Sequence, residues 1–177
     1  MNHYIFALKP TMDAHQLVMN TLHKTGQDWK TEPFLKVQFA NLGSAIVVRT
    51  NQEPTGIPCK TETRIFDDGQ SVSILVILPA QKRAREYRTA PAIRTKSEMI
   101  EYAQGLLAAQ GLAVHSIECK PAQTVGCKKN DRVTVIAAMQ VTATATITDA
   151  MAFVAAYDQG IGREKSLGFG MLLVKES

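Results

Sequence analysis

The segment Gly160–Leu172 reads GIGREKSLGFGML, and it is the most informative stretch of the 177-residue sequence. Four glycines lie within eleven residues, and glycine accepts positive φ angles and a close backbone approach that other residues resist. Arg163, Lys165 and Ser166 lie between the glycine pairs, so the pattern predicts exposed N–H groups beside two cations and a hydroxyl. This combination suits a phosphate-rich ligand.

The spacing of these glycines differs from the common phosphate-binding patterns. It matches neither the P-loop nor the dinucleotide fingerprint, and the strand-then-helix context that both require is missing. A helix-like segment precedes the glycines, and FGMLLV at residues 169–174 is typical of a terminal strand. We therefore predict a basic glycine-rich loop that closes the end of a sheet and faces RNA or another polyanion.

This loop resembles the C-terminal glycine-rich loop of the RAMP superfamily, the ferredoxin-like RNA-binding proteins of CRISPR systems. Within the superfamily the sequence is most similar to the CasE-type endoribonucleases, which cut CRISPR precursor RNA within each repeat. Three further stretches are similar in the same order: DAHQL at 13–17, GSAIVVRT at 43–50 and ITDAMAF at 147–153. They resemble the start of the family's first helix, its third strand and its approach to the loop. Only the loop is specific.

Strand and helix patterns alternate along the chain. Asp13 is a predicted N-cap for a helix to Lys24, and Gly26 and Gly111 are predicted to end helices. The other two helix patterns span 97–110 and 149–159. Strand patterns occupy 3–8, 34–39, 45–49, 72–78, 114–119 and 133–148, before the terminal strand.

From this order and the resemblance we predict an α+β fold with two tandem ferredoxin-like (RRM-like) units and antiparallel sheets. Residues 1–90 form the N-terminal unit, which includes the strand at 72–78. Residues 91–177 form the C-terminal unit with the glycine-rich loop. The order of elements alone would also permit one larger α+β domain.

Composition narrows the class of protein. The formal net charge of +4 suits a nucleic-acid binder, and 45% hydrophobic residues suffice for a core. We expect no signal peptide and no membrane association, because no apolar stretch approaches about 20 residues. Three cysteines at irregular spacing favour reduced thiols in the cytoplasm. His115, Cys119 and Cys127 lack the paired spacing of zinc ligands, so we predict no metal and no cofactor.

The resemblance implies metal-independent cleavage that leaves a 2′,3′-cyclic phosphate. It also implies a tyrosine and a histidine on the first helix, beside the glycine-rich loop. Aligned on Asp13 and Leu17, the tyrosine position holds His15 and the histidine position holds Val18. The sequence thus departs from the family's pattern at its central catalytic residue.

Helical geometry singles out His15 as the catalytic candidate. At about 100° per residue, Ala14, Leu17, Val18 and Thr21 form the inward arc of the helix. His15 lies on the border of that arc, where packing could orient an imidazole that RNA still reaches; an imidazole serves as acid or base near neutral pH. The alternative is a half-buried surface histidine. His23, on the opposite face, is the second candidate.

RNA contacts are predicted for three groups of residues. An A-form stem is recognised mainly through its phosphates and shape, so cations should carry these contacts, and aromatic residues are only 6% of the chain. Each cationic group could equally be a solvated face. The three groups are the loop (Gly160, Gly162, Arg163, Lys165, Ser166, Gly168, Gly170), a segment resembling the family's basic hairpin (Lys82, Arg83, Arg85, Arg88) and a predicted turn (Lys128, Lys129, Arg132).

The predicted function is that of a CRISPR repeat-specific endoribonuclease. It would cut precursor RNA at the base of the repeat stem-loop, stay bound to the guide RNA and join other subunits of an effector complex. A non-cleaving subunit that holds the RNA handle is the first alternative, favoured by Val18. A ferredoxin-like interaction domain, in which the glycine-rich loop is only a tight turn, is the second.

Overall fold

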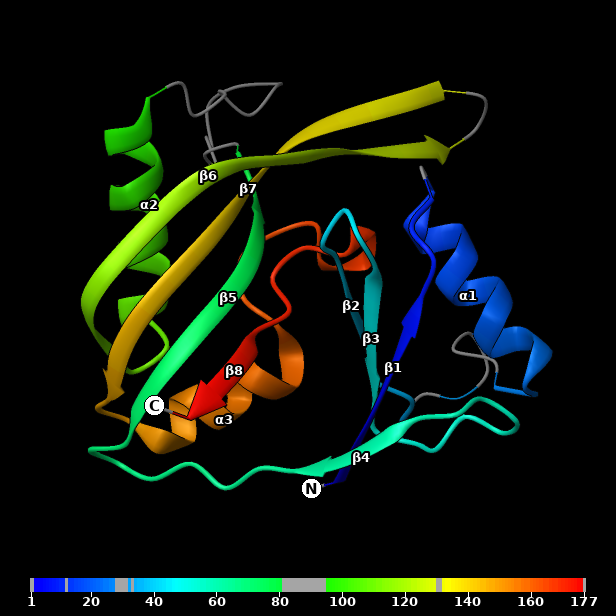
Figure 1. The fold of residues 1–177 in the computed structure, drawn as a ribbon, viewed down its shortest axis with the longest axis horizontal. Coiled ribbons are helices and arrows are strands. Elements are labelled where there is room, and N and C mark those ends of the chain that lie inside the picture. The colour runs from blue at the N-terminus through cyan, green and yellow to red at the C-terminus, as the bar shows by residue number, and fades with distance from the viewer. Residues whose placement is uncertain are drawn as a thin grey trace.

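The computed structural model describes residues 2–11, 13–27, 32, 34–80, 95–129 and 132–176, with only the backbone described at 123–129, 132–134 and 176. Strands and helices alternate along the chain, and the two β-sheets lie between α1 and α2 in Figure 1. The elements are β1 (Asn2–Leu8), α1 (Ala14–Lys24), β2 (Val37–Asn41), β3 (Ile46–Thr50), β4 (Lys60–Thr63), β5 (Ser71–Pro79), α2 (Lys96–Ala108), β6 (Leu112–Lys129), β7 (Arg132–Ile147), α3 (Ala150–Gln159), the short 3₁₀ helix η1 (Lys165–Leu167) and β8 (Leu173–Glu176).

The first sheet has the strand order β2-β3-β1-β4 and is antiparallel throughout. Helix α1 covers it because Ala14, Val18 and Leu22 recur at the helical period and are buried. The side chain of Asp13 accepts a hydrogen bond from the Gln16 N–H at 2.9 Å, which confirms it as the N-cap. The strand patterns at 34–39 and 45–49 correspond to β2 and β3, which pair antiparallel as a hairpin.

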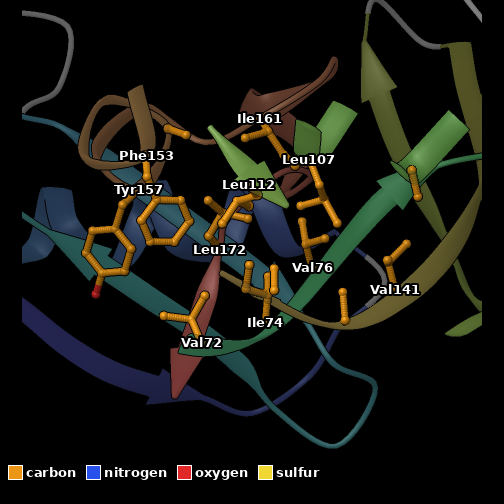
Figure 2. Packing of buried hydrophobic residues seen from close by; sticks show 14 of the residues in the cluster. Val72, Ile74, Val76, Leu107, Leu112, Val141, Phe153, Tyr157, Ile161 and Leu172 are labelled. Atoms are coloured by element: carbon orange, nitrogen blue, oxygen red, sulfur yellow. The ribbon is translucent and has the colours of Figure 1, made fainter. Parts of the chain in front are cut away.

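The second sheet has the order β6-β7-β5-β8 and is also antiparallel. Helices α2 and α3 pack on one face of it through Ala103, Leu107 and Phe153, which all belong to one buried cluster. Figure 2 shows this cluster between the strands and the helices. Strands β6 and β7 form a long two-stranded ribbon that extends past β5 towards the first sheet (Figure 1).

These two four-stranded sheets confirm the predicted α+β fold with antiparallel, tandem ferredoxin-like units. One assignment within it is wrong. The strand predicted at 72–78, placed in the N-terminal unit, is β5, and it pairs with β7 and β8 of the second sheet. The apolar pattern of residues 72–78 predicts a strand, but it does not indicate which distant strands pair with it. The domain boundary predicted at residue 90 falls outside the described residues and stays a prediction.

Apolar packing joins the two units at the end of the chain. A buried cluster combines Ala40 of β2 with Ile77 of β5 and with Phe169 and Met171 of the glycine-rich segment. Because this segment is packed between the two sheets, it lies against the N-terminal unit as well as its own. The fold therefore brings residues 160–172 to the side of the first sheet where α1 begins.

Candidate active site at the glycine-rich loop

The glycine-rich loop connects α3 to β8 and needs its glycines for packing. Gly170 has φ +80°, and a Cβ there would lie 1.9 Å from the carbonyl oxygen of Ile161. Gly168 has φ +91°, and a Cβ would lie 2.5 Å from the ring of Phe39. Any side chain at these two positions would therefore displace either the loop backbone or the first sheet.

Part of the loop differs from the predicted set of exposed N–H groups. Two N–H groups of the glycine pairs are used within the fold: Ile161 donates to the Gly170 carbonyl and Gly170 to the Ile77 carbonyl, both at 2.8 Å. Gly160, Gly168 and Gly170 are buried. The exposed part of the loop is η1, where the side chains of Lys165 and Ser166 face solvent. An RNA contact here would be made by these side chains.

His15 of α1 meets this exposed part of the loop. Its Nδ1 lies 2.5 Å from the carbonyl oxygen of Ser166, and its ring centroid lies 6.3 Å from that of Phe39. A carbonyl oxygen can only accept, so Nδ1 carries the proton, and in the neutral ring Nε2 is then the basic nitrogen. The border position predicted for His15 is confirmed, because its exposure is intermediate between that of buried Ala14 and that of exposed Gln16. Its catalytic role stays a prediction.

A pocket of about 320 Å³ lies between α1, β2 and the loop. His15, Lys165 and Ser166 line it together with Gln38 and Gln159, so an imidazole and an ammonium share one concave surface. The remaining lining is mostly apolar: Met19, Leu35, Val37, Phe39, Gly160, Phe169 and Met171. A pocket with an apolar wall and a few convergent polar groups is the usual form of a ligand site.

Arg163 lies apart from this pocket. Its Nη2 is 3.8 Å from Glu164 Oε1, and its side chain is 36% exposed. The preceding residue, Gly162, faces Leu106 of α2 and Leu78, because a Cβ there would lie 3.6 Å from both side chains. Arg163 is therefore partly neutralised by its neighbour.

The other predicted site residues are not gathered at this pocket. His23 is exposed near the end of α1 and does not line it. Eight residues separate His23 from His15, which is about 12 Å along a helix. Lys128, Lys129 and Arg132 lie at the tip of the β6–β7 ribbon, where only the backbone is described. Lys82, Arg83, Arg85 and Arg88 lie outside the described residues.

A buried polar network that the sequence did not reveal lies between the two units. Arg49 of β3 is only 3% exposed, and its guanidinium carbon lies 3.7 Å from the centre of the Tyr157 ring. Tyr157 donates its hydroxyl to Glu62 at 2.9 Å, and Arg64 donates to Glu62 at 2.7 Å. The sequence offered one signal of this network, which is the charged Arg49 beside the apolar residues of IVVRT. A charge buried in such a strand requires polar partners.

The pKa values in this network reflect its burial. Burial raises the pKa of Tyr157 to about 12, despite the nearby positive charge of Arg49. Burial alone would raise the pKa of Glu62, but the hydrogen bonds from Arg64 and Tyr157 outweigh it and lower that pKa. Burial and the charge of Arg49 lower the pKa of His3, which lies 3.2 Å from Asp158. Near neutral pH the lowered pKa favours the neutral ring of His3, whose Nε2 lies next to the Asp158 carboxylate.

Two features are missing from the part of the chain that the structure describes. It contains no group of three or more histidine, cysteine, aspartate or glutamate residues arranged to hold a metal ion. It also contains no helix long and apolar enough to cross a membrane.

A comparison with models of protein families assigns the chain to a family. A family model described as CRISPR associated protein matches residues 67–176. The chain belongs to this family. The matched range begins just before β5 and includes the whole second sheet, α2, α3 and the glycine-rich loop. A comparison of the sequence with curated proteins gives no match.

Solved structures share the fold of this CRISPR-associated protein over almost its full length. The CRISPR endoribonuclease Cse3 bound to a 19-nucleotide RNA has a TM-score of 0.77 at 18% identity, covering 98% of each chain. Cse3 of Thermus thermophilus, bound to an RNA that represents a pre-cleavage complex, also gives 0.77 at 18%, covering 99% of this chain and 100% of that one. Cas6e of Escherichia coli K-12 gives 0.71 at 16%, covering both chains fully. At such identities the likeness shows the fold.

Proposed function

We propose that this protein is a metal-independent endoribonuclease that cuts CRISPR precursor RNA at the base of the repeat stem-loop. The observation that carries the proposal is the contact between His15 Nδ1 and the Ser166 carbonyl, which holds an imidazole at a pocket beside Lys165. The shared fold supports it, because Cse3 endoribonuclease has been solved with RNA bound. The formal charge of +4 suits a polyanionic substrate.

The chemistry assigned to the site is an internal transesterification of RNA. The 2′-oxygen attacks the adjacent phosphorus, and its proton passes to Nε2 of His15. The bond from phosphorus to the 5′-oxygen breaks, and that oxygen takes a proton from water. The Lys165 ammonium stabilises the extra negative charge on the phosphorane. The hydroxide left by that water takes the proton back from Nε2, and the products are a 2′,3′-cyclic phosphate and a 5′-hydroxyl. The attacking nucleophile is the 2′-oxygen of the RNA itself, so water serves only to carry a proton.

The deciding experiment incubates the purified protein with the repeat RNA of its own locus in EDTA. We expect one cut at the 3′ base of the stem-loop, with a cyclic phosphate on the upstream fragment and the guide RNA still bound to the protein. Activity that EDTA abolishes and Mg²⁺ restores would contradict the mechanism. Tight binding of intact RNA without cleavage would contradict the enzymatic assignment.

The second candidate function is that of a subunit that binds the guide-RNA handle without cutting it. Val18, at the position of the family's histidine, is 0% exposed, packs in the core of the first unit and does not line the pocket. Under this alternative, His15 is only a structural link between α1 and the loop. Cleavage by the unaltered protein separates the two functions.

The proposed partners are the repeat stem-loop and other subunits of a CRISPR effector complex in the cytoplasm. Structures described as CRISPR RNA-guided surveillance complexes contain chains of this fold, one with a TM-score of 0.63 at 18% identity. Co-purification of the protein with the remaining effector subunits and the guide RNA tests this assembly. Recovery of the protein alone, under conditions in which the other subunits assemble, would count against it.

A further inference from the structure

Arg49 connects the buried network between the two units to the glycine-rich loop. Its Nη1 donates to the carbonyl oxygen of Tyr157 at 3.0 Å, and its Nη2 donates to the carbonyl oxygen of Leu172 at 2.7 Å. Tyr157 lies in α3 just before the loop, and Leu172 lies just after it. One guanidinium of the first unit thus holds both stems of the loop that belongs to the second.

The position of the guanidinium is itself fixed from several sides. Gln38 accepts a further hydrogen bond from Nη1 at 3.1 Å, and the ring of Tyr157 lies beneath the guanidinium plane. Burial lowers the pKa of Arg49, whereas the nearby carboxylate of Glu62, which accepts the Tyr157 hydroxyl, favours its charged form. A planar group with several donors is suited to bridge two carbonyls, and lysine cannot reproduce this arrangement.

The loop transmits this constraint to the candidate site. Its stems end at Gly160 and Met171, and both residues line the pocket of His15 and Lys165. Between them, the Ser166 carbonyl accepts the hydrogen bond that sets the orientation of His15. A shift of about 1 Å in a group that orients a catalytic residue can cost about 100-fold in rate.

We propose that Arg49 is a positioning residue: its guanidinium fixes both stems of the glycine-rich loop and, through the Ser166 carbonyl, the imidazole of His15. This role goes beyond the residues that face the pocket, since Arg49 acts through the loop and touches no substrate. Its effect on cleavage rests on the proposed function, whereas its effect on the loop does not.

The test compares Arg49→Gln and Arg49→Lys with Arg64→Gln. Arg64 is the comparison residue because it also reaches from the first unit to β8: it donates to the Val174 carbonyl at 3.1 Å and to Glu62 at 2.7 Å, and both of these acceptors lie outside the two stems. Hydrogen exchange is measured at the amides of Ile161 and Gly170, which donate to the carbonyls of Gly170 and of Ile77 in β5, and at Val141 in the middle of β7. Single-turnover cleavage and RNA affinity are measured on the same proteins.

In both Arg49 variants we expect exchange at Ile161 and Gly170 to accelerate at least tenfold more than at Val141. Cleavage should slow by about 10- to 100-fold with a smaller change in RNA affinity. Arg64→Gln should change all three amides alike and slow cleavage less than either Arg49 variant, because Arg64 contacts Glu62 and not the two carbonyls that Arg49 holds. Equal acceleration at loop and β7 amides in the Arg49 variants would overturn the proposal.

Two further outcomes are decisive. If neither Arg49 variant folds, hydrogen exchange of the unaltered protein is the test. Protection of the Ile161 and Gly170 amides to the same degree as the Val141 amide would support the proposal. Exchange of these loop amides at the rate of an unstructured peptide would overturn it. If the unaltered protein does not cleave repeat RNA, the proposed function fails. The exchange experiment uses no RNA, so it still shows whether Arg49 holds the loop.

Discussion

Nδ1 of His15 lies 2.5 Å from the carbonyl oxygen of Ser166, although 151 residues separate the two in the sequence. This contact joins the first helix of the N-terminal unit to the loop that ends the C-terminal unit. The site therefore exists only when both units are folded and docked. Agents that separate the units should abolish activity before either sheet unfolds.

Replacing His15 tests the proposed base. His15→Ala should slow single-turnover cleavage by about 10²–10⁴-fold, because the 2′-hydroxyl loses its proton acceptor. RNA affinity should stay nearly unchanged. The control is His23→Ala on the same helix, whose imidazole does not line the pocket. A wild-type rate in His15→Ala would remove the assignment and make His23 the next residue to test.

Salt dependence distinguishes the two cations of the loop. Lys165→Ala should weaken RNA binding and flatten the slope of log Kd against log salt by about one unit, as expected when one phosphate contact is lost. Arg163→Ala should have the smaller effect, because Glu164 partly neutralises Arg163. If both variants retain full affinity and slope, the loop is only a tight turn, as in an interaction domain.

Gly170 and Gly162 should respond differently to substitution. Gly170→Ala should lower the free energy of unfolding by about 3 kcal/mol or more, because positive φ strain adds to the clash with the Ile161 carbonyl. Gly162→Ala has positive φ but ordinary contacts at 3.6 Å, so its cost should be about 1 kcal/mol. Urea unfolding measures both. Equal losses would show that the clash is relieved by movement of the loop.

Acid should destabilise the fold in two steps. The pKa of His3 is lowered in the folded state, so the unfolded chain binds the proton more readily. The contribution of His3 is complete above its unfolded pKa of about 6.5 and is lost as the pH falls through the lower folded value. The pKa of Glu62 is also lowered, so its contribution is lost in the same way, starting below about pH 4.3.

Unfolding free energies measured across this range check both steps. His3→Gln should remove the loss that begins near pH 6.5 and leave the loss at lower pH. Glu62→Gln should do the reverse. His23→Gln is the matched control for the first step, since its imidazole is exposed at the end of α1. An unchanged pH profile in His3→Gln would show that another group causes the first loss.

Local patterns predicted the elements better than the sheet to which each belongs. The predicted ends of helix α1 agree with the structure because Asp13 caps its first turn and Gly26 follows its last turn. Strand β6 was predicted to end at Cys119 but continues through Pro121 to Lys129. A proline interrupts a central strand, yet β6 is at the edge of its sheet, where an unpaired side tolerates the missing N–H.

The candidate site was predictable only in part. The border position of His15 follows from helical periodicity, and the resemblance brought the helix and the loop together. The network around Arg49 depends on contacts between residues of the two units that lie more than 100 residues apart in the sequence. No local pattern encodes such contacts.

Arg49 and Arg64 also protect the edge of the second sheet from pairing with another copy of the chain. Strand β8 is the outer strand of its sheet, and an outer strand with unpaired carbonyls is a template on which another chain can add a strand. Arg64 occupies the Val174 carbonyl, and Arg49 occupies the Leu172 carbonyl just before the strand. Two side chains of one unit thus take the place of a further strand in the other. When these two contacts are broken, β8 should pair with strands of other copies of the chain. Aggregation during storage would then be an early sign that the two units have separated.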